Sequence, residues 1–430
     1  MATQHPNQMP CLLFANSRGE IQEFPELNMA GRSAYSFCQP KLSELIPLPE
    51  GSEIFVLPNR LPVGFAPDDI EAAKLAENPY AVEDGIQAVA AFISPAHTAI
   101  HLAAYEKDDS SPIPLPLFAY TAVGWHDGQF WVSAFRSDPS PRQEIAHFDL
   151  REIQKNTERA LKANPGNRLI QHLGKCCLTY SCPAAKNFFL GRHEAPLPTS
   201  PTCNARCVGC ISLQPSGCCP STQERIKFVP SVQEIGEIAI PHLAQVKKAV
   251  VSFGQGCEGE PLLQAETIEN AIRHIRKSTS KGTINLNTNA SLPDEIEMLA
   301  AAGLDSIRAS LNSARLHEHS LYYRPKGFDL NSVKQSIKIM KKHDRFVSLN
   351  YFLFAGFTDC VPEFDALCAL IEECRPDFIQ LRNLNMDPDW YLETVNQPLT
   401  SSAMGILPWL AKLKQLFPFL KFGYFNPPLR

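Results

Sequence analysis

The sequence lacks the features that mark membrane, secreted and strongly charged proteins. It has no run of about eighteen consecutive apolar residues, the length expected of a membrane-spanning helix. The stretch MATQHPNQMPCLLF has no basic segment followed by a long apolar one, so it does not indicate a secretory signal. A net charge of −5 and a pI near 6.2 provide no general attraction to nucleic acid or to an anionic membrane. We therefore expect a cytoplasmic protein with no membrane partner.

Cysteine is also sparse for a chain of this size. Fourteen cysteines among 430 residues are far fewer than a disulfide-stapled scaffold contains. A chain that is 44% hydrophobic can bury a large core without staples. In a reducing compartment, cysteines that cluster in sequence are typical of metal ligands or reactive groups.

The pattern of the chain changes near residue 186. Before it, the segments 53–58 and 117–135 predict strands, and Asp127-Gly128 between aromatic runs predicts a hairpin turn. The segment 68–78 has a helical pattern, and a helix is expected from Asp149, with Glu152 in a capping box, to just before Pro165. We predict an N-terminal α+β domain (1–147), a helical linker rich in cysteine (148–185), an α/β domain (186–390) and a C-terminal helix and strand (391–430).

The second half alternates short strands with amphipathic helices. The expected strands are 187–192, 249–254, 283–289, 306–312, 346–354 and 377–385. Helix caps are expected at Ser231 with Glu234, at Ser291, and at Gly303. Six β/α units in series predict a parallel sheet, open or curled into a partial (β/α)6 TIM-like barrel, with ligands bound beyond the carboxyl ends of the strands.

Cys203, Cys207 and Cys210 form the pattern C-x3-C-x2-C just after the first expected strand. Three thiolates on one short loop can bind three irons of a cubane 4Fe-4S cluster and leave the fourth iron open. A zinc site completed by Cys218 or Cys219, or free buried thiols, would also account for this pattern.

The turn Glu258-Gly259-Glu260-Pro261 follows the next expected strand. Together with the cysteine loop and the order of strands, it resembles the radical S-adenosylmethionine (SAM) superfamily over roughly residues 186–390. The resemblance implies that a 4Fe-4S cluster binds SAM and cleaves it reductively, and that the resulting 5′-deoxyadenosyl radical removes a hydrogen atom from a substrate. It also implies a reducing partner such as flavodoxin or ferredoxin. One departure is Gly209, where the family usually has an aromatic residue.

The resemblance transfers roles to individual residues. The cluster ligands correspond to Cys203, Cys207 and Cys210. The turn that receives the methionine amino group corresponds to Gly259, Glu260 and Pro261. Four strand-end residues match regions that contact the rest of SAM: Asn287, Asn289, Ser310 and Asn312.

Three interpretations of the remaining cysteines stay open. They are inert buried thiols, which is common for cysteine, or they bind an auxiliary iron-sulfur cluster, or one of them acts on the substrate radical. The auxiliary-cluster candidates are Cys176, Cys177, Cys182, Cys218 and Cys219. Cys257, inside the GCEGEP turn, or Cys182 would serve as a hydrogen-atom donor, and Cys257 is our candidate catalytic residue.

The substrate is the least determined part of the prediction. Polar residues at the ends of two late strands are candidate substrate ligands: Asn350, Arg382, Asn383 and Asn385. Arg382 suits a carboxylate, phosphate or amide-bearing group, whereas strand-end capping or a structural ion pair is the alternative. We favour a peptide or a small molecule. Alternatives are an RNA-modifying enzyme, although the basic segments 273–281 and 341–345 are expected on outer helices, and a non-catalytic zinc or iron-sulfur protein.

Overall fold

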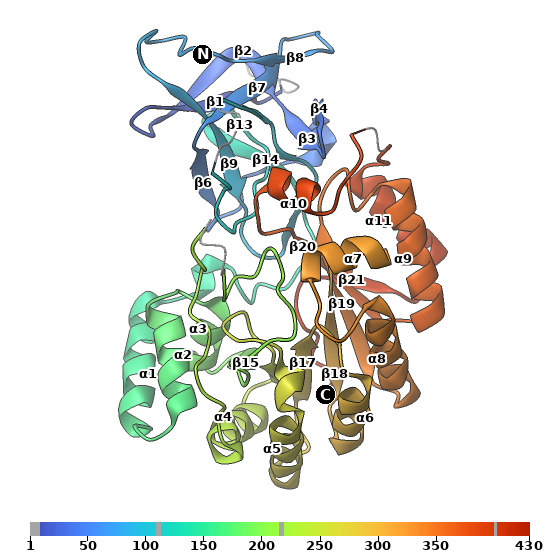
Figure 1. The fold of residues 1–430 in the computed structure, drawn as a ribbon. Coiled ribbons are helices and arrows are strands. Elements are labelled where there is room, and N and C mark those ends of the chain that lie inside the picture. The colour runs from blue at the N-terminus through green and yellow to red at the C-terminus, as the bar shows by residue number, and fades with distance from the viewer. Residues whose placement is uncertain (1–8, 109–112, 215–218, 400–401) are drawn as a thin grey trace. The chain divides into compact units, whose positions relative to one another are not determined.

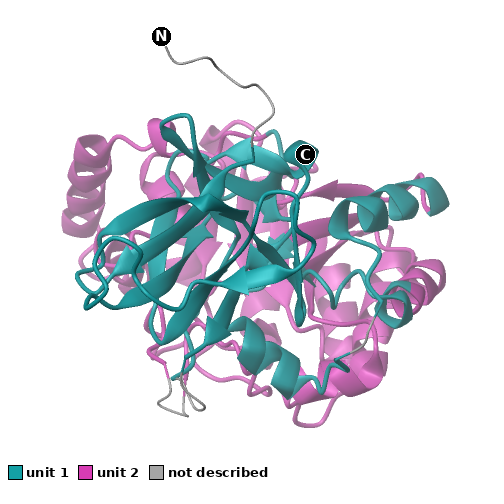
Figure 2. Ribbon diagram, turned by 90° about the horizontal axis from the view of Figure 1, so that it is seen from above, with its two compact units in different colours: residues 1–139, 352–364, 382–416 teal, residues 140–351, 365–381, 417–430 magenta. Residues whose placement is uncertain are grey.

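The computed structural model describes residues 9–108, 113–214, 219–399 and 402–430. The chain packs into two compact units, coloured separately in Figure 2. Unit 1 comprises residues 1–139, 352–364 and 382–416, and unit 2 comprises 140–351, 365–381 and 417–430. Each unit combines separate segments of the chain, whereas the predicted domains are contiguous. The predicted domain boundaries stay predictions.

The N-terminal part of unit 1 is built from antiparallel strands. They are β1 (Cys11–Asn16), β2 (Ile21–Met29), β3 (Gly31–Ser33), β4 (Ser36–Cys38), β5 (Leu45–Pro47), β6 (Glu53–Leu57), β7 (Arg60–Phe65), β8 (Ala72–Lys74), β9 (Ile86–Phe92), β10 (His97–Ala99), β11 (Leu102–Ala103), β12 (Tyr105–Lys107), β13 (Val123–His126) and β14 (Gln129–Arg136). Between β13 and β14, Asp127 (φ 49°) and Gly128 (φ 76°) form the predicted two-residue turn.

The prediction of α-helices in the N-terminal domain is wrong, because the helices and strands in the described residues of this region are β-strands and short 3-10 helices only. The segment 68–78 is not a helix. Its residues Ala72–Lys74 form β8 and pair with β7, and Ile70 is 93% exposed, so the apparent apolar face of a helix has nothing to cover it. Backbone pairing with an existing strand edge outweighs a weak helix propensity.

Buried ion pairs connect the segment 382–416, which carries α10 (Pro388–Thr394) and α11 (Ile406–Leu416), to the rest of unit 1. Arg60 pairs with Asp387 at 2.8 Å, and their side chains are 1% and 2% exposed. Asp387 also accepts a hydrogen bond from the backbone N–H of Leu115 at 2.8 Å. Arg32 pairs with Asp389 at 2.9 Å. Each charge therefore has a partner inside the unit.

Unit 2 opens with three helices, α1 (Leu150–Ala163), α2 (Arg168–Leu178) and α3 (Pro183–Phe189), and continues as an α/β structure. Its parallel strands are β15 (Glu194–Leu197), β16 (Val250–Phe253), β17 (Thr283–Thr288), β18 (Ser306–Leu311), β19 (Phe346–Leu353), β20 (Phe378–Asn383) and β21 (Lys421–Gly423). The intervening helices are α4 (Val232–Gln245), α5 (Ala265–Ser278), α6 (Pro293–Ala302), α7 (Leu316–Tyr323), α8 (Leu330–Lys342) and α9 (Val361–Cys374).

The strands lie side by side in sequence order from β15 to β21, and α4, α5, α6 and α8 follow one another along the sheet (Figure 1). Five of the six predicted strands are confirmed with small shifts at their ends. The strand expected at 187–192 is wrong, because Pro183 at the first position of α3 starts a helix there and the first strand begins at Glu194. The predicted C-terminal strand is confirmed as β21, so the sheet has seven strands rather than six.

Side chains on the inner face show that the sheet curls. Asn426 donates to Glu194 Oε1 on β15 at 2.9 Å and to Asn287 Oδ1 on β17 at 3.2 Å. It accepts from Gln380 Nε2 on β20 at 2.8 Å. Strands that are not neighbours in the sheet thus meet through one side chain, as a partial TIM-like barrel requires.

Most predicted helix ends of unit 2 are confirmed. Asp149 caps α1, Ser231 and Glu234 form a capping box on α4, and Gly303 ends α6 at φ 112°. The capping box predicted for Asp149 and Glu152 is not formed, because only the Asp149 side chain accepts backbone hydrogen bonds there. The start expected at Ser291 is wrong, because α6 begins at Pro293, whose fixed φ suits the first helical position. No helix in the described parts of the chain combines the length and apolar character needed to cross a membrane.

Candidate active site

The cysteine loop follows β15 and is held by the backbone of helix α7. Arg206 N–H donates to Tyr323 O at 2.9 Å, and Val208 N–H donates to Tyr322 O at 3.0 Å. Cys210 N–H donates to Cys207 O at 3.2 Å, which closes a turn between two of the predicted ligands. The loop is therefore shaped by main-chain contacts on both sides of Cys207.

The three loop thiols are close enough to influence one another. Burial raises the pKa of Cys203 to about 11. The pKa of Cys207 is raised well above its usual value by burial, and then by the charges of Cys210 and Cys203. Such thiols ionise only when a cation neutralises them, and a coordinating metal does so directly. Three partly buried thiols on one loop fit a metal or iron-sulfur group that binds through thiolates.

The turn after β16 lies directly against the start of the cysteine loop. Gly259 N–H donates to Ser200 O at 2.7 Å, and Glu260 N–H donates to Thr202 O at 2.8 Å. A Cβ on Gly259 would lie 1.9 Å from Thr202 O, so only glycine permits this approach. Cys203 is the next residue after Thr202. The structure thus brings together the two motifs that the sequence pointed to.

Two buried carboxyl groups support this contact. Glu260 accepts from the Thr288 hydroxyl, from Asn289 N–H at 2.8 Å and from Leu262 N–H at 3.1 Å. Glu258 accepts from the N–H groups of residues 199, 200 and 255. Burial raises the pKa of each carboxyl to about 7, although the hydrogen bonds oppose it. Glu258 links the turn to the end of β15, and Glu260 links it to the end of β17.

The predicted residues on β17 have different surroundings. Asn289 Nδ2 donates to Asn204 Oδ1 at 2.8 Å, so this side chain contacts the cysteine loop. Asn287 is buried in the inner face, where it donates to Gly254 O at 2.8 Å and accepts from Asn285 and Asn426. Its amide is thus engaged by the protein.

Ser310 and Asn350 are paired residues on β18 and β19, near the carboxyl ends of these strands, and both are half-buried. Asn312, just after β18, is fully buried and donates to Glu318 O at 3.2 Å. The cofactor and substrate roles of these three residues stay predictions.

The other candidate substrate residues belong to unit 1. Asn383 donates to His97 O at 3.1 Å and accepts from Ala99 N–H at 2.9 Å, so both ends of its amide hold strand β10. Arg382 is half-buried and Asn385 is exposed. Their binding roles stay predictions.

Arg225 is a candidate site residue that the sequence did not reveal. Its Nη2 lies 3.5 Å from Cys210 Sγ, and its Nε donates to Ser212 Oγ at 3.1 Å. A guanidinium at this position stabilises a thiolate. It lies fifteen residues beyond Cys210 in a segment without a motif, so only the folded loop identifies it.

Cys257, the predicted catalytic residue, is buried and contacts Cys176 on α2. The nearby Cys257 thiol, with a further contribution from His172, lowers the pKa of Cys176 to about 5. The same contact and burial raise the pKa of Cys257. The catalytic role of Cys257 stays a prediction.

The remaining auxiliary-cluster candidates do not form one group in the described chain. Cys177 lies 3.6 Å from Thr157 Oγ1 on α1. Cys219 is buried after the cysteine loop, and Cys218 lies outside the described residues.

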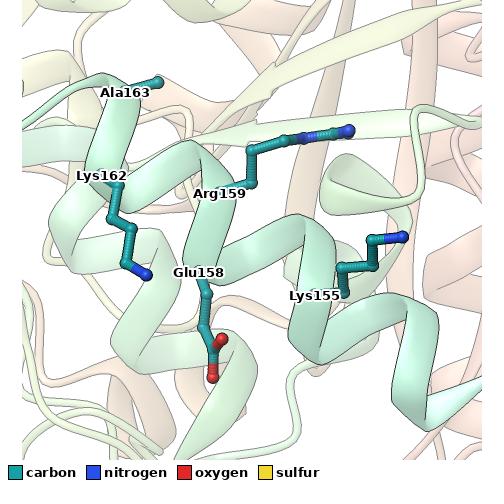
Figure 3. Close-up of a pocket in the computed structure, with 5 residues that line it drawn as sticks. All are labelled: Lys155, Glu158, Arg159, Lys162 and Ala163. Carbon is teal, nitrogen blue, oxygen red and sulfur yellow. The ribbon is translucent and has the colours of Figure 1, made fainter.

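A surface hollow on α1 is a separate feature. Figure 3 shows its lining residues, all from this one helix: Lys155, Glu158, Arg159, Lys162 and Ala163. All five are exposed. No other element contributes a group to the hollow, so nothing there selects a ligand.

A family model matches part of the chain. Residues 197–368 match the model of the Radical SAM superfamily, the range that contains both the cysteine loop and the turn after β16. No curated protein sequence matches the chain.

Solved structures show weak likeness. The hydrogenase maturase HydG from Carboxydothermus hydrogenoformans is 14% identical, with 63% of this chain and 70% of that chain covered and a TM-score of 0.38. SuiB from Streptococcus suis, bound to S-adenosylmethionine, is 13% identical, with 65% and 67% covered and a TM-score of 0.38. Methylornithine synthase is 10% identical, with 65% and 72% covered and a TM-score of 0.37. Likeness at these scores supports no inference about function.

Proposed function

We propose that the chain, of which residues 197–368 match the Radical SAM superfamily model, is a radical SAM enzyme that holds a 4Fe-4S cluster on Cys203, Cys207 and Cys210. With this cluster it cleaves SAM reductively and removes a hydrogen atom from a bound substrate. The observation that carries the proposal is the pair of hydrogen bonds from Gly259 and Glu260 to residues 200 and 202, at 2.7 and 2.8 Å. They hold the turn against the residue that precedes the first cysteine.

The residues of the site have separable tasks in this proposal. The three thiolates would hold three irons of the cluster, which would supply the chemistry of reductive SAM cleavage when bound. Gly259 lets the backbone of the turn approach the loop, and Pro261 and Glu260 keep that backbone rigid. Arg225 places a positive charge beside Cys210 at 3.5 Å. Asn289 holds the loop through Asn204 at 2.8 Å.

We propose further that the substrate is a peptide or a small molecule bound beyond the carboxyl ends of the strands. Ser310 and Asn350 support this, since they are half-buried neighbours at that end of β18 and β19. The substrate roles predicted for Arg382, Asn383 and Asn385, which belong to unit 1, are a separate proposal and are not assigned to this site. The electron would come from a small reducing protein such as flavodoxin or ferredoxin.

The test is SAM cleavage by anaerobically reconstituted protein under a strong reductant, followed as 5′-deoxyadenosine, together with iron and acid-labile sulfide per chain. Wild type should bind about four irons at this site and release 5′-deoxyadenosine. Triple substitution Cys203→Ala, Cys207→Ala, Cys210→Ala should abolish both. The matched control is Cys177→Ala with Cys374→Ala, two buried cysteines outside the loop, which should retain both. Cleavage that survives the triple substitution would refute the ligand assignment.

A further inference from the structure

A second set of metal-ligating side chains contains no residue of the cysteine loop. It consists of His172 and Cys176 on α2 and Cys257 in the turn after β16. His172 Nε2, Cys176 Sγ and Cys257 Sγ all lie within 4.8 Å of one another. In the described part of the chain, the ligand atoms of these three residues are close enough together to hold one metal ion.

The positions follow from the fold of α2. His172 and Cys176 are four residues apart on this helix, so their side chains share one face. The adjacent Cys177 points elsewhere, to Thr157 at 3.6 Å. His172 is further fixed by an edge-on ring contact with Phe228 at 6.4 Å. The helix therefore presents one imidazole and one thiol toward Cys257.

The distance between the Cys176 sulfur and the His172 nitrogen matches that between two ligands of a tetrahedral zinc ion. Zn–S bonds of about 2.3 Å and Zn–N bonds of about 2.0–2.1 Å at tetrahedral angles place a sulfur and a nitrogen ligand about 3.6 Å apart. The distance between Cys176 Sγ and His172 Nε2 is 3.5 Å. A single ion fits between these atoms without a rearrangement of the helix.

Cys182 is next to this set through its backbone, since its N–H donates to Cys176 O at 3.1 Å. The ligand atoms that lie within reach of one ion are those of His172, Cys176 and Cys257. We propose that His172, Cys176 and Cys257 bind one divalent ion of the zinc type, in a Cys2His site separate from the loop of Cys203, Cys207 and Cys210.

The ion would connect α2 to the turn that contains Gly259 and Glu260. An ion that joins two segments in this way contributes its binding free energy to folding. The proposal does not rest on the radical SAM function, because none of its ligands is a loop cysteine. It also assigns Cys257 a role other than hydrogen-atom donation, since a thiolate bound to zinc carries no S–H.

The experiment uses the full chain with Cys203→Ala, Cys207→Ala and Cys210→Ala, so that the loop cannot contribute metal. Zinc per chain is measured after anaerobic purification, and the metal-free protein is then titrated with Co²⁺ while tetrahedral thiolate absorption is recorded. We expect about one equivalent of either ion. Adding Cys176→Ser to this variant should weaken Co²⁺ binding more than ~100-fold, because loss of a direct ligand costs more than loss of a residue that only hydrogen-bonds to a ligand. The matched control Cys177→Ser should bind as the parent does.

A second variant keeps the test informative if Cys176→Ser does not fold. His172→Cys should retain Co²⁺ and increase the intensity of the thiolate-to-cobalt band, because a thiolate replaces the imidazole. An unchanged spectrum in His172→Cys, absence of zinc and cobalt in the loop-less parent, or equal binding by Cys176→Ser would each overturn the proposal. Iron and sulfide at about four per chain in the loop-less parent would overturn it in favour of an auxiliary cluster.

Discussion

Gly259→Ala tests whether the turn after β16 and the cysteine loop are built as one unit. A Cβ at this position would lie 1.9 Å from Thr202 O and 2.4 Å from Thr202 C, and real Cβ contacts are essentially never under 3.0 Å. The two segments must therefore separate by about 1 Å, since the obstructing atoms are backbone in a close-packed interior. The hydrogen bonds of 2.7 and 2.8 Å across this contact would be lost or strained.

The expected cost follows from those bonds. At about 1 kcal/mol each, two backbone hydrogen bonds amount to about 2 kcal/mol. For a unit of roughly 150–250 residues, that lowers Tm by about 4–8 °C. Because Thr202 precedes Cys203, the same displacement moves a cluster ligand, so SAM cleavage should fall by more than the stability loss alone explains.

The assay combines thermal unfolding of the metal-free chain with 5′-deoxyadenosine formation by the reconstituted protein. Gly166→Ala is the matched control, because a Cβ there meets no atom within 4 Å. If Gly259→Ala melts and cleaves SAM as wild type does, the close approach of the two segments is not present in the protein, and the main support for the proposed function is lost.

Two further substitutions test the packing of each unit by denaturant unfolding. Asp387→Asn should destabilise unit 1 by about 3–5 kcal/mol, because it leaves the buried Arg60 guanidinium without its counter-charge. The control Glu393→Gln, at a 65% exposed carboxylate, should cost under about 1 kcal/mol. Equal losses of stability in the two variants would contradict the importance of the buried ion pair. In unit 2, hydrogen bonds from Arg168 lower the pKa of Glu234 to about 2. This stabilisation is present above about pH 4.5 and is lost as pH falls toward 2. Glu234→Gln should cost about 1–2 kcal/mol at pH 7, less than the full shift implies since Arg168 is half-exposed. That difference should vanish near pH 2, and a pH-independent difference would show that the ion pair is not its cause.

Local sequence patterns determined the parts of the fold that depend on neighbouring residues. The cap at Asp149, the box at Ser231 and Glu234, the turn at Asp127-Gly128 and the αL position at Gly303 are all confirmed. Each involves hydrogen bonds or backbone angles within a few residues, so the residue types are sufficient to predict it. The alternation of strands and helices after residue 186 was predictable for the same reason.

The two errors in predicted elements have different causes. Within 68–78, which has a helical pattern, Ala72–Lys74 pair with the distant strand β7. The segment 187–192 has strand-like residues, but the nearby Pro183 starts a helix that runs to Phe189. In both places the intrinsic preference is small, and pairing with an existing edge or a start signal upstream outweighs it.

The same division holds for the site. The C-x3-C-x2-C and Gly-Glu-Pro motifs, with the order of strands, were sufficient to indicate a resemblance to the radical SAM superfamily, and the family model matches residues 197–368. Tertiary structure alone decided that Arg225 lies beside Cys210, and that Asn289 contacts the cysteine loop whereas Asn287 contacts the inner face of the sheet. It also brought His172 and Cys176 to Cys257, more than eighty positions away in the printed sequence. Sequence spacing carries no information about such contacts, because the path of the intervening helices and strands determines which side chains meet.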